Sequence, residues 1–315
     1  MQTFDASCLL RADGIPDPTP ERTTHKACVT HPRSFVPSVN VRCGVMPGPG
    51  GDIWWEQHGS GPRTPLLVLH GGPGAAHHYL RSLSRLADER PVIFYDQAGC
   101  GRSAIPQNPA LYGSQRFVDE IEAVRATLGL ERVSLYGHGW GATLALEYLL
   151  SGERQGIEKL ILASATASSR QRAAGRRLLM RAIPDGSGLL LLALEDCAKT
   201  DTTEYWELRD IFETRHVLRT VPTASYRSSV IEYATSPAAR LTTWLPDWDR
   251  SADLRAIDVP TLIATGEYDE VSIDCHETLR DGIRGSQLSI VRGCSHLPML
   301  EAPAIYARLL RSFLD

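Results

Sequence analysis

The sequence has no hydrophobic run long enough to cross a membrane and no excess of basic residues. None of its segments reaches the roughly eighteen uninterrupted apolar residues that mark a membrane span. The 315 residues include 33 Lys and Arg against 37 Asp and Glu, which gives a formal net charge of −4. This acidic balance argues against general binding of nucleic acid. We therefore expect neither a membrane nor a nucleic acid as partner.

Cysteine is sparse, and its spacing fits neither a metal site nor a disulfide framework. The seven cysteines are scattered along the chain, and no two of them form a C-x-x-C pair. This pattern predicts free thiols in a reducing compartment and no zinc site. Residues 1–15 lack a continuous hydrophobic segment after a basic start, which argues against an ordinary signal peptide. Together these features predict a cytoplasmic protein.

Short apolar runs alternate with helical patterns along most of the chain. Strands are expected at 53–58, 66–69, 92–96, 133–136, 160–163, 259–265 and 287–291. Helices are expected at about 75–87, 115–128, 142–150 and 302–313. Apolar residues make up 43% of the sequence, enough for a sizeable core. This alternation predicts an α/β fold with a mostly parallel, doubly wound sheet.

The strand pattern stops between residues 165 and 250, where helical segments replace it. An insertion placed between sheet strands is expected to form a helical cap over the strand ends and to line a substrate pocket. The core would then comprise residues 41–164 and 251–315. Residues 1–40 are rich in Pro, Thr and charge, and we expect a poorly structured N-terminal extension there.

The first segment of this insertion is basic. It contains Arg170, Arg172, Arg176, Arg177 and Arg181. A solvated helix face is the expected role of such a cluster, and an anion-binding surface is the alternative. Further helices are expected at 204–218 and at 226–234.

The most informative stretch is G-H-G-W-G at 137–141, which joins the strand expected at 133–136 to the helix expected at 142–150. This is the layout of a nucleophile elbow, G-x-S-x-G, a strained turn that raises a serine above the sheet. The central residue here is Gly139, so the attacking oxygen is missing. A side chain at an elbow's positive φ costs about 1–3 kcal/mol, and glycine avoids that cost. We therefore expect the fold to tolerate the change.

A second glycine turn, H-G-G-P-G at 70–74, directly follows an expected strand. Backbone N–H groups in such a turn, beside a helix N-terminus, are suited to holding an anion. In an acyl-transfer site Gly71 and Gly72 would supply one donor of an oxyanion hole, and Trp140 N–H would supply the other. The alternative is a plain strand-to-helix turn.

Two late residues complete the set. Asp269 follows the strand expected at 259–265, and His296 follows the strand expected at 287–291. Elbow, acid and histidine in this order match the Ser…Asp…His order of the α/β-hydrolase fold. We expect Asp269 to orient His296 and stabilise its protonated form, and His296 to act as general base and acid. Cys100 lies in a glycine turn, where we expect a structural thiol and not a nucleophile.

Four motifs together resemble proline iminopeptidases and related amino-acid amidases. They are H-G-G-P-G at 70–74, D-Q-x-G-C-G-R-S at 96–103, G-H-x-W-G at 137–141 and G-x-x-H-x-P at 293–298. The resemblance runs from about residue 40 to the C-terminus. It implies an α/β-hydrolase core with a helical cap, a small-molecule substrate and hydrolysis of N-terminal residues, amides or esters without a cofactor. We expect the substrate pocket to be lined by His70, His138, Trp206 and Glu232.

The chain departs from that family at two places. The nucleophile position holds Gly139, and the family's acidic Gly-Pro-Ser-Glu-Phe cap segment, which holds the substrate's amine, corresponds to residues 235–241, which contain no acid. Glu232 is the alternative acid. The two departures favour an enzyme that uses His296 and Asp269 for acid–base chemistry, as a lyase, isomerase, cyclase or water-activating hydrolase. The alternatives are an inactivated serine-to-glycine variant of an aminopeptidase, amidase or esterase, and a non-catalytic ligand-binding protein.

Overall fold

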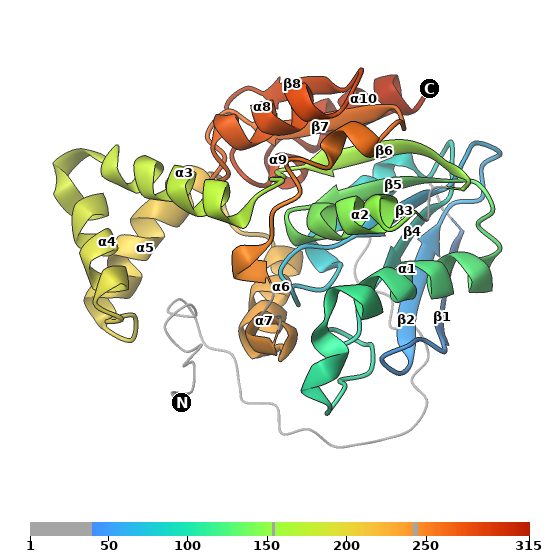
Figure 1. Ribbon diagram of the computed structural model, residues 1–315, viewed down its shortest axis with the longest axis horizontal. Helices are drawn as coiled ribbons and strands as arrows, with labels where there is room; N and C mark the ends of the chain where they lie inside the picture. Colours follow the sequence, from blue (N-terminus) through green and yellow to red (C-terminus); the bar gives the residue numbers. More distant parts are fainter. Residues whose placement is uncertain (1–39, 153–154, 242–244) are drawn as a thin grey trace.

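The computed structural model describes residues 40–152, 155–241 and 245–315, so nearly all of the expected extension at 1–40 lies outside the described residues. An eight-stranded sheet runs in the order β1-β2-β4-β3-β5-β6-β7-β8 (Figure 1). The β1–β2 and β2–β4 pairs are antiparallel, and all other neighbouring pairs are parallel. This confirms the prediction of an α/β-hydrolase fold with a mostly parallel, doubly wound sheet.

The strands and helices have the following bounds. The strands are β1 (Val41–Met46), β2 (Ile53–His58), β3 (Leu66–Leu69), β4 (Val92–Tyr95), β5 (Val133–His138), β6 (Ile157–Ala163), β7 (Thr261–Gly266) and β8 (Gln287–Val291). The helices, with η marking a 3-10 helix, are η2 (His78–Leu86), η3 (Pro109–Tyr112), α1 (Ser114–Leu128), α2 (Trp140–Leu150), α3 (Ser169–Arg181), η4 (Pro184–Gly186), α4 (Ser187–Asp196), α5 (Thr203–His216), α6 (Ala224–Thr235), α7 (Ala238–Leu241), η5 (Leu245–Asp247), η6 (Leu254–Ala256), α8 (Ile273–Gly282), α9 (Pro298–Glu301) and α10 (Pro303–Leu314).

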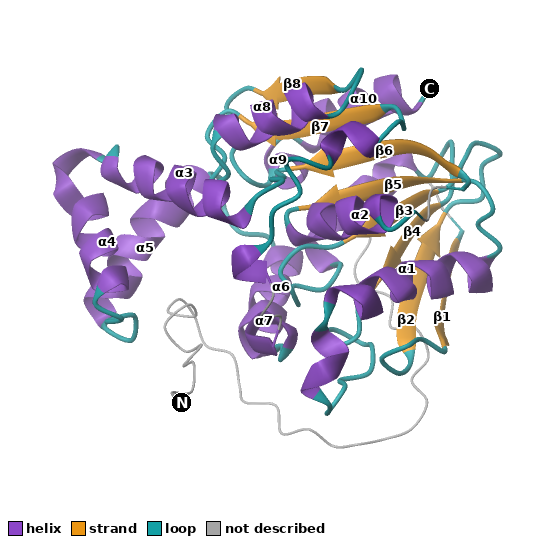
Figure 2. Ribbon diagram, in the orientation of Figure 1, coloured by secondary structure: helices purple, strands orange, loops and turns teal. Residues whose placement is uncertain are grey.

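The central strands are buried on both faces because helices cover both sides of the sheet (Figure 2). Side chains alternate between the faces of a strand. In β3, Leu67 packs on one side in a cluster with Phe117 of α1, and Val68 packs on the other in a cluster with Leu80 of η2 and Leu310 of α10. The fully apolar sequence of β3 therefore follows from its place between two helical layers.

Helices η2 and α8 differ from the sequence-based expectation. The helix expected at 75–87 is the shorter 3-10 helix η2. Its entry is held by side chains, since His77 N–H donates to Asp96 Oδ1 (3.0 Å) and Tyr79 N–H donates to Ser229 Oγ (3.2 Å). Helix α8 was not expected. Its buried residues include Cys275 and His276, so the hydropathy of its buried face is weak.

Helices α3 to α7 lie between β6 and β7 in the chain, in the segment where the sequence predicts a cap, and we refer to them as the cap helices. That they cover a substrate pocket stays a prediction. In Figure 1, α3, α4 and α5 project to the left of the sheet and α6 and α7 lie nearer to it. The arginines of α3 are mostly paired, because Arg172, Arg176 and Arg177 bind Glu270, Glu195 and Asp196, and Arg170 lies 3.6 Å from Asp247. These pairs neutralise much of the basic face and argue against the anion-binding alternative.

No helix in the described parts of the chain has the length and apolar character needed to cross a bilayer. The cytoplasmic location expected from the sequence stays a prediction.

Candidate active site

The turn between β5 and α2 places one open position directly in front of His296. Gly139 is the N-cap of α2 and has φ 53° and ψ −111°, a backbone conformation that side chains rarely adopt. A Cβ built there would lie 3.8 Å from His296 Nε2 and 4.0 Å from its Cε1. Both are ordinary contact distances, so a side chain at residue 139 would be strained by its φ but would have room beside the imidazole.

His296 is paired with Asp269, as the order of the motifs predicts. His296 Nδ1 lies 2.8 Å from Asp269 Oδ1, and Asp269 also accepts hydrogen bonds from Thr265 Oγ1 (2.8 Å) and Val271 N–H (2.9 Å). Burial alone would raise the pKa of Asp269, but the charge and hydrogen bond of His296 hold that pKa well below its ordinary value. The carboxylate is therefore ionised, and it fixes the proton of His296 on Nδ1.

The pKa of His296 is raised above its ordinary value. Burial would lower this pKa, but the charge and hydrogen bond of Asp269, and then the charge of Glu270, outweigh burial. Only 12% of the imidazole side chain is exposed. The ring is thus set up to hold a proton and to return it.

Glu270 is a site residue that the sequence reasoning missed. Its Oε1 lies 3.9 Å from His296 Nε2 and accepts a hydrogen bond from Arg172 of α3 (2.6 Å). Burial raises the pKa of Glu270, but the Arg172 and His296 charges lower it to about 2. A second carboxylate therefore faces the ring from the side opposite Asp269. Its position next to Asp269 in the sequence was the available signal.

The hydrogen bonds of the glycine turn at 70–74 remove Gly71 from the expected donors of the oxyanion hole. Gly71 N–H donates to the Tyr79 hydroxyl (2.8 Å), so this donor is already used. Gly72 has φ 124°, and within the described residues its N–H has no acceptor. Trp140 is the first residue of α2, so its N–H lies at the positive end of that helix. Gly72 and Trp140 remain the candidate donors.

Two of the four expected pocket residues are buried behind the site. His70 has no exposed surface, and its Nδ1 is bonded to Gly71 O (2.9 Å) while its Nε2 accepts from Gln97 N–H (3.1 Å). His138 is 3% exposed and contacts the His296 carbonyl oxygen through Nε2 (3.0 Å). Both rings are buried in this arrangement, and a pocket role for them stays a prediction. Both hold loops in place.

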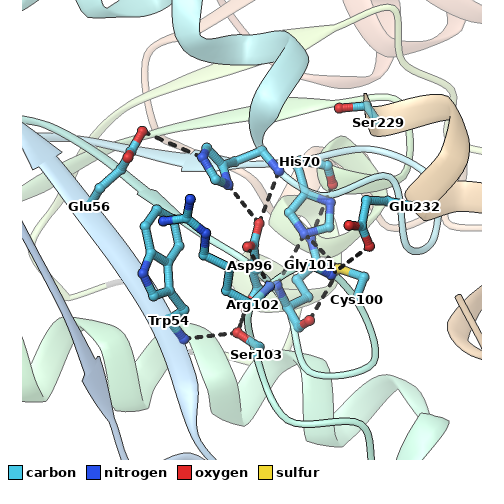
Figure 3. Close-up of polar contacts among 12 residues, drawn as sticks. Trp54, Glu56, His70, Asp96, Cys100, Gly101, Arg102, Ser103, Ser229 and Glu232 are labelled. Carbon is cyan, nitrogen blue, oxygen red and sulfur yellow. Dashed lines mark hydrogen bonds and ion pairs between the residues drawn. The ribbon is translucent and has the colours of Figure 1, made fainter. Parts of the chain in front are cut away.

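The other two expected pocket residues lie on the cap. Trp206 of α5 packs against a cluster of buried apolar side chains from α3, α4 and α5. Its ring meets Tyr205 edge to face, and Arg209 lies over it. Glu232 of α6 reaches the core, where its Oε2 accepts from Gly101 N–H (3.1 Å), as Figure 3 shows. Glu232 therefore joins helix α6 to the loop that follows β4. A pocket role for these two residues stays a prediction.

That loop is organised around Asp96 (Figure 3). Asp96 is fully buried and accepts from His77 Nδ1 (2.7 Å), from His77 N–H and from Arg102 N–H (3.0 Å). In the same loop Cys100 donates its thiol to Gln97 O (3.2 Å), and burial raises its pKa far above the ordinary value. Cys100 is thus a structural thiol, as expected.

Comparisons with known proteins agree with this geometry. A model of the alpha/beta hydrolase family matches residues 66–309. The proline iminopeptidase of Lactobacillus delbrueckii subsp. lactis is 32% identical over 266 residues, covering 80% of this chain and 90% of that protein. That of Saccharolobus solfataricus is 30% identical over 291 residues, covering 88% and 94%. The crystal structure of the proline iminopeptidase of Mycobacterium smegmatis superimposes with a TM-score of 0.80 at 29% identity, covering 87% of this chain and 97% of that one. The chain therefore belongs to the alpha/beta hydrolase family and is of the proline iminopeptidase type.

Proposed function

We propose that this protein is an enzyme that has lost the serine nucleophile at residue 139 and uses His296 and Asp269 for acid–base chemistry on a small amide, ester or carbonyl compound. One observation carries the proposal. The open position at Gly139 faces His296 Nε2, while His296 Nδ1 keeps its 2.8 Å bond to an ionised Asp269. A histidine held in this way retains a general base after the nucleophile is gone.

The chemistry follows from where the proton sits. In neutral His296 the Nδ1 proton is donated to Asp269, so the lone pair of Nε2 faces the space beside Gly139. This nitrogen takes a proton from a water molecule or from a carbon next to a carbonyl group. The imidazolium that results lies between the carboxylates of Asp269 and Glu270, which stabilise it. His296 then returns the proton to the product.

For hydrolysis, the water oxygen attacks the carbonyl carbon as Nε2 removes one of its protons. The negative charge develops on the carbonyl oxygen, where the N–H groups of Gly72 and Trp140 are the proposed donors. The C–N or C–O bond then breaks, and the leaving nitrogen or oxygen receives the proton from His296. For isomerisation or elimination, the same donors would stabilise the enolate that forms when Nε2 removes a carbon-bound proton.

A second candidate function is favoured by the space at residue 139. Because a Cβ there meets only His296 atoms at ordinary contact distance, a serine fits. The chain is then an inactivated variant of an aminopeptidase, amidase or esterase whose remaining groups are intact. The segment at 235–241, which has no acidic residue, argues against free amino termini as substrates in either case.

The test is a panel of small amides, esters and carbonyl compounds, given to the unmodified protein and to His296→Ala. Deuterium exchange from D₂O reports proton abstraction, and product formation reports hydrolysis. We expect at least one compound to react, and His296→Ala to slow that reaction by about a hundredfold or more. Turnover that His296→Ala leaves unchanged would sink the proposal. Turnover that appears only in Gly139→Ser would favour the second candidate.

A further inference from the structure

A buried chain of hydrogen bonds joins the glycine turn after β3 to the backbone of His296. Gly71 N–H donates to the Tyr79 hydroxyl (2.8 Å), that hydroxyl lies 2.8 Å from His138 Nδ1, and His138 Nε2 lies 3.0 Å from the His296 carbonyl oxygen. We propose that Tyr79 and His138 are positioning residues that fix the His296 backbone and the glycine turn relative to each other. The inference rests on the proposed role of His296 as the base.

The direction of every bond in this chain is determined. A carbonyl oxygen only accepts, so His138 Nε2 must carry the ring proton. The neutral ring then has a lone pair on Nδ1, which accepts from the Tyr79 O–H. The Tyr79 oxygen in turn accepts from Gly71 N–H. Each donor has one acceptor, so the three links support one another, and loss of one link disturbs the others.

The side chains that form these hydrogen bonds have little room to shift. Tyr79 is 4% exposed and His138 is 3% exposed, and their rings meet edge to face with centroids 5.3 Å apart. A Cβ at Gly71 would lie 2.7 Å from the Tyr79 hydroxyl and 3.3 Å from His138 Nδ1. The Tyr79 hydroxyl therefore takes the space that any side chain at residue 71 would need. This explains the glycine at that position.

His138 cannot replace His296 as the base. Burial, and then the charge of His296, lowers the pKa of His138 to about 3. The ring is thus neutral throughout the range in which His296 titrates, and its tautomer is set by its two partners. A neutral ring of fixed tautomer is suited to holding a carbonyl group in place.

The His296 backbone is held from two further directions. Ser164 Oγ donates to the same His296 carbonyl oxygen (3.0 Å), and His296 N–H donates to His216 O at the end of α5 (3.2 Å). Helix α6 also reaches this hydrogen-bonded chain at Tyr79, whose N–H donates to Ser229 Oγ (3.2 Å). Tyr79 thus lies where the cap, the glycine turn and the elbow meet.

The test measures the imidazole rings directly, by ¹⁵N NMR titration of the unmodified protein, Tyr79→Phe, His138→Ala and His138→Gln. It needs no substrate, so it can fail or succeed independently of the proposed function. Tyr112→Phe is the matched control, since it removes another buried hydroxyl, one that donates to Pro106 O. His296 also faces Asp269, Glu270 and Arg172, and all three stay unchanged in every variant.

We expect the unmodified protein to show His138 as the Nε2–H tautomer at pH 7. In Tyr79→Phe and His138→Ala we expect the pKa of His296 to fall by about 0.5 units or more, because a displaced ring loses part of its bond to Asp269. His138→Gln keeps an N–H donor for the His296 carbonyl and should recover most of that fall. Tyr112→Phe should leave the His296 pKa in place. An Nδ1–H tautomer of His138, or a His296 pKa that Tyr79→Phe leaves unmoved, would overturn the proposal.

Discussion

Replacing Gly139 by serine should create an activated nucleophile at a small and calculable cost in stability. The residue has φ 53°, and the imidazole of His296 is the nearest group to a Cβ built there, 3.8 Å from Nε2. Serine Oγ lies one covalent bond beyond Cβ. A staggered χ1 rotamer therefore brings it to about 2.6–3.2 Å from Nε2, the range in which a general base acts.

The stability cost comes from the backbone and not from packing. A side chain at such a φ costs about 1–3 kcal/mol, and in domains of this size each kcal/mol lowers the melting temperature by about 2–4 °C. We expect Gly139→Ser to melt roughly 2–12 °C below the unmodified protein. Gly139→Ala has the same φ and no hydroxyl, so it should lose as much stability.

The assay is labelling by a fluorophosphonate, which reacts with activated serines. Gly139→Ser should be labelled, whereas Gly139→Ala and Gly139→Ser combined with His296→Ala should not. The reasoning is refuted if Gly139→Ser folds, melts in the expected range and is labelled no faster than Gly139→Ala. In that case His296 Nε2 does not activate a group at residue 139.

Three further predictions concern the supports of the site. Glu147→Ala removes the acceptor of Trp248 Nε1 and Arg250, so it should lower the free energy of unfolding in urea by about 1–3 kcal/mol; Glu147→Gln should lose less. Glu232→Ala removes the acceptor of Gly101 N–H, so hydrogen exchange in α6 should quicken while exchange in β5 stays slow. Burial would lower the pKa of His77, but Asp96 and Glu56 raise it. The interactions of protonated His77 with these carboxylates therefore stabilise the fold fully below about pH 6.5, the pKa of an unfolded histidine. This stabilisation is lost as pH rises through the folded pKa of His77. Urea titrations at different pH values should show the loss, and His77→Gln should abolish it.

The sequence predicted the parts of the site that depend on chain order. Apolar runs identified the strands, and in a parallel sheet the carboxyl ends of strands meet at one edge. Asp269 and His296 each follow such a strand, so their 2.8 Å contact was predictable from position alone. The place of Gly139 at this edge of the sheet was predictable for the same reason, since it lies in the turn between the end of β5 and the start of α2.

The residues that were missed depend on side-chain direction and on contacts between distant segments. Glu270 reaches His296 Nε2 because Arg172 draws its carboxylate to α3, and these two residues are 98 positions apart. Tyr79 fits an apolar helix pattern, and nothing in that pattern shows that its hydroxyl binds Gly71 N–H. His70 was expected in the pocket, but its ring is buried and its Nε2 accepts from Gln97 N–H. Sequence position locates a loop, and packing decides which way its side chains point.

The pH dependence of turnover tests the central claim most directly. With the first compound that the unmodified protein converts, kcat/KM is measured from about pH 5 to 9, in the unmodified protein and in Asp269→Asn. Because the base is neutral His296, whose pKa Asp269 raises, kcat/KM should climb with pH through an apparent pKa above 6.5. Asp269→Asn should lower that apparent pKa and reduce kcat/KM by about a hundredfold or more. A rate independent of pH over this range, or one that Asp269→Asn leaves unchanged, would contradict the account.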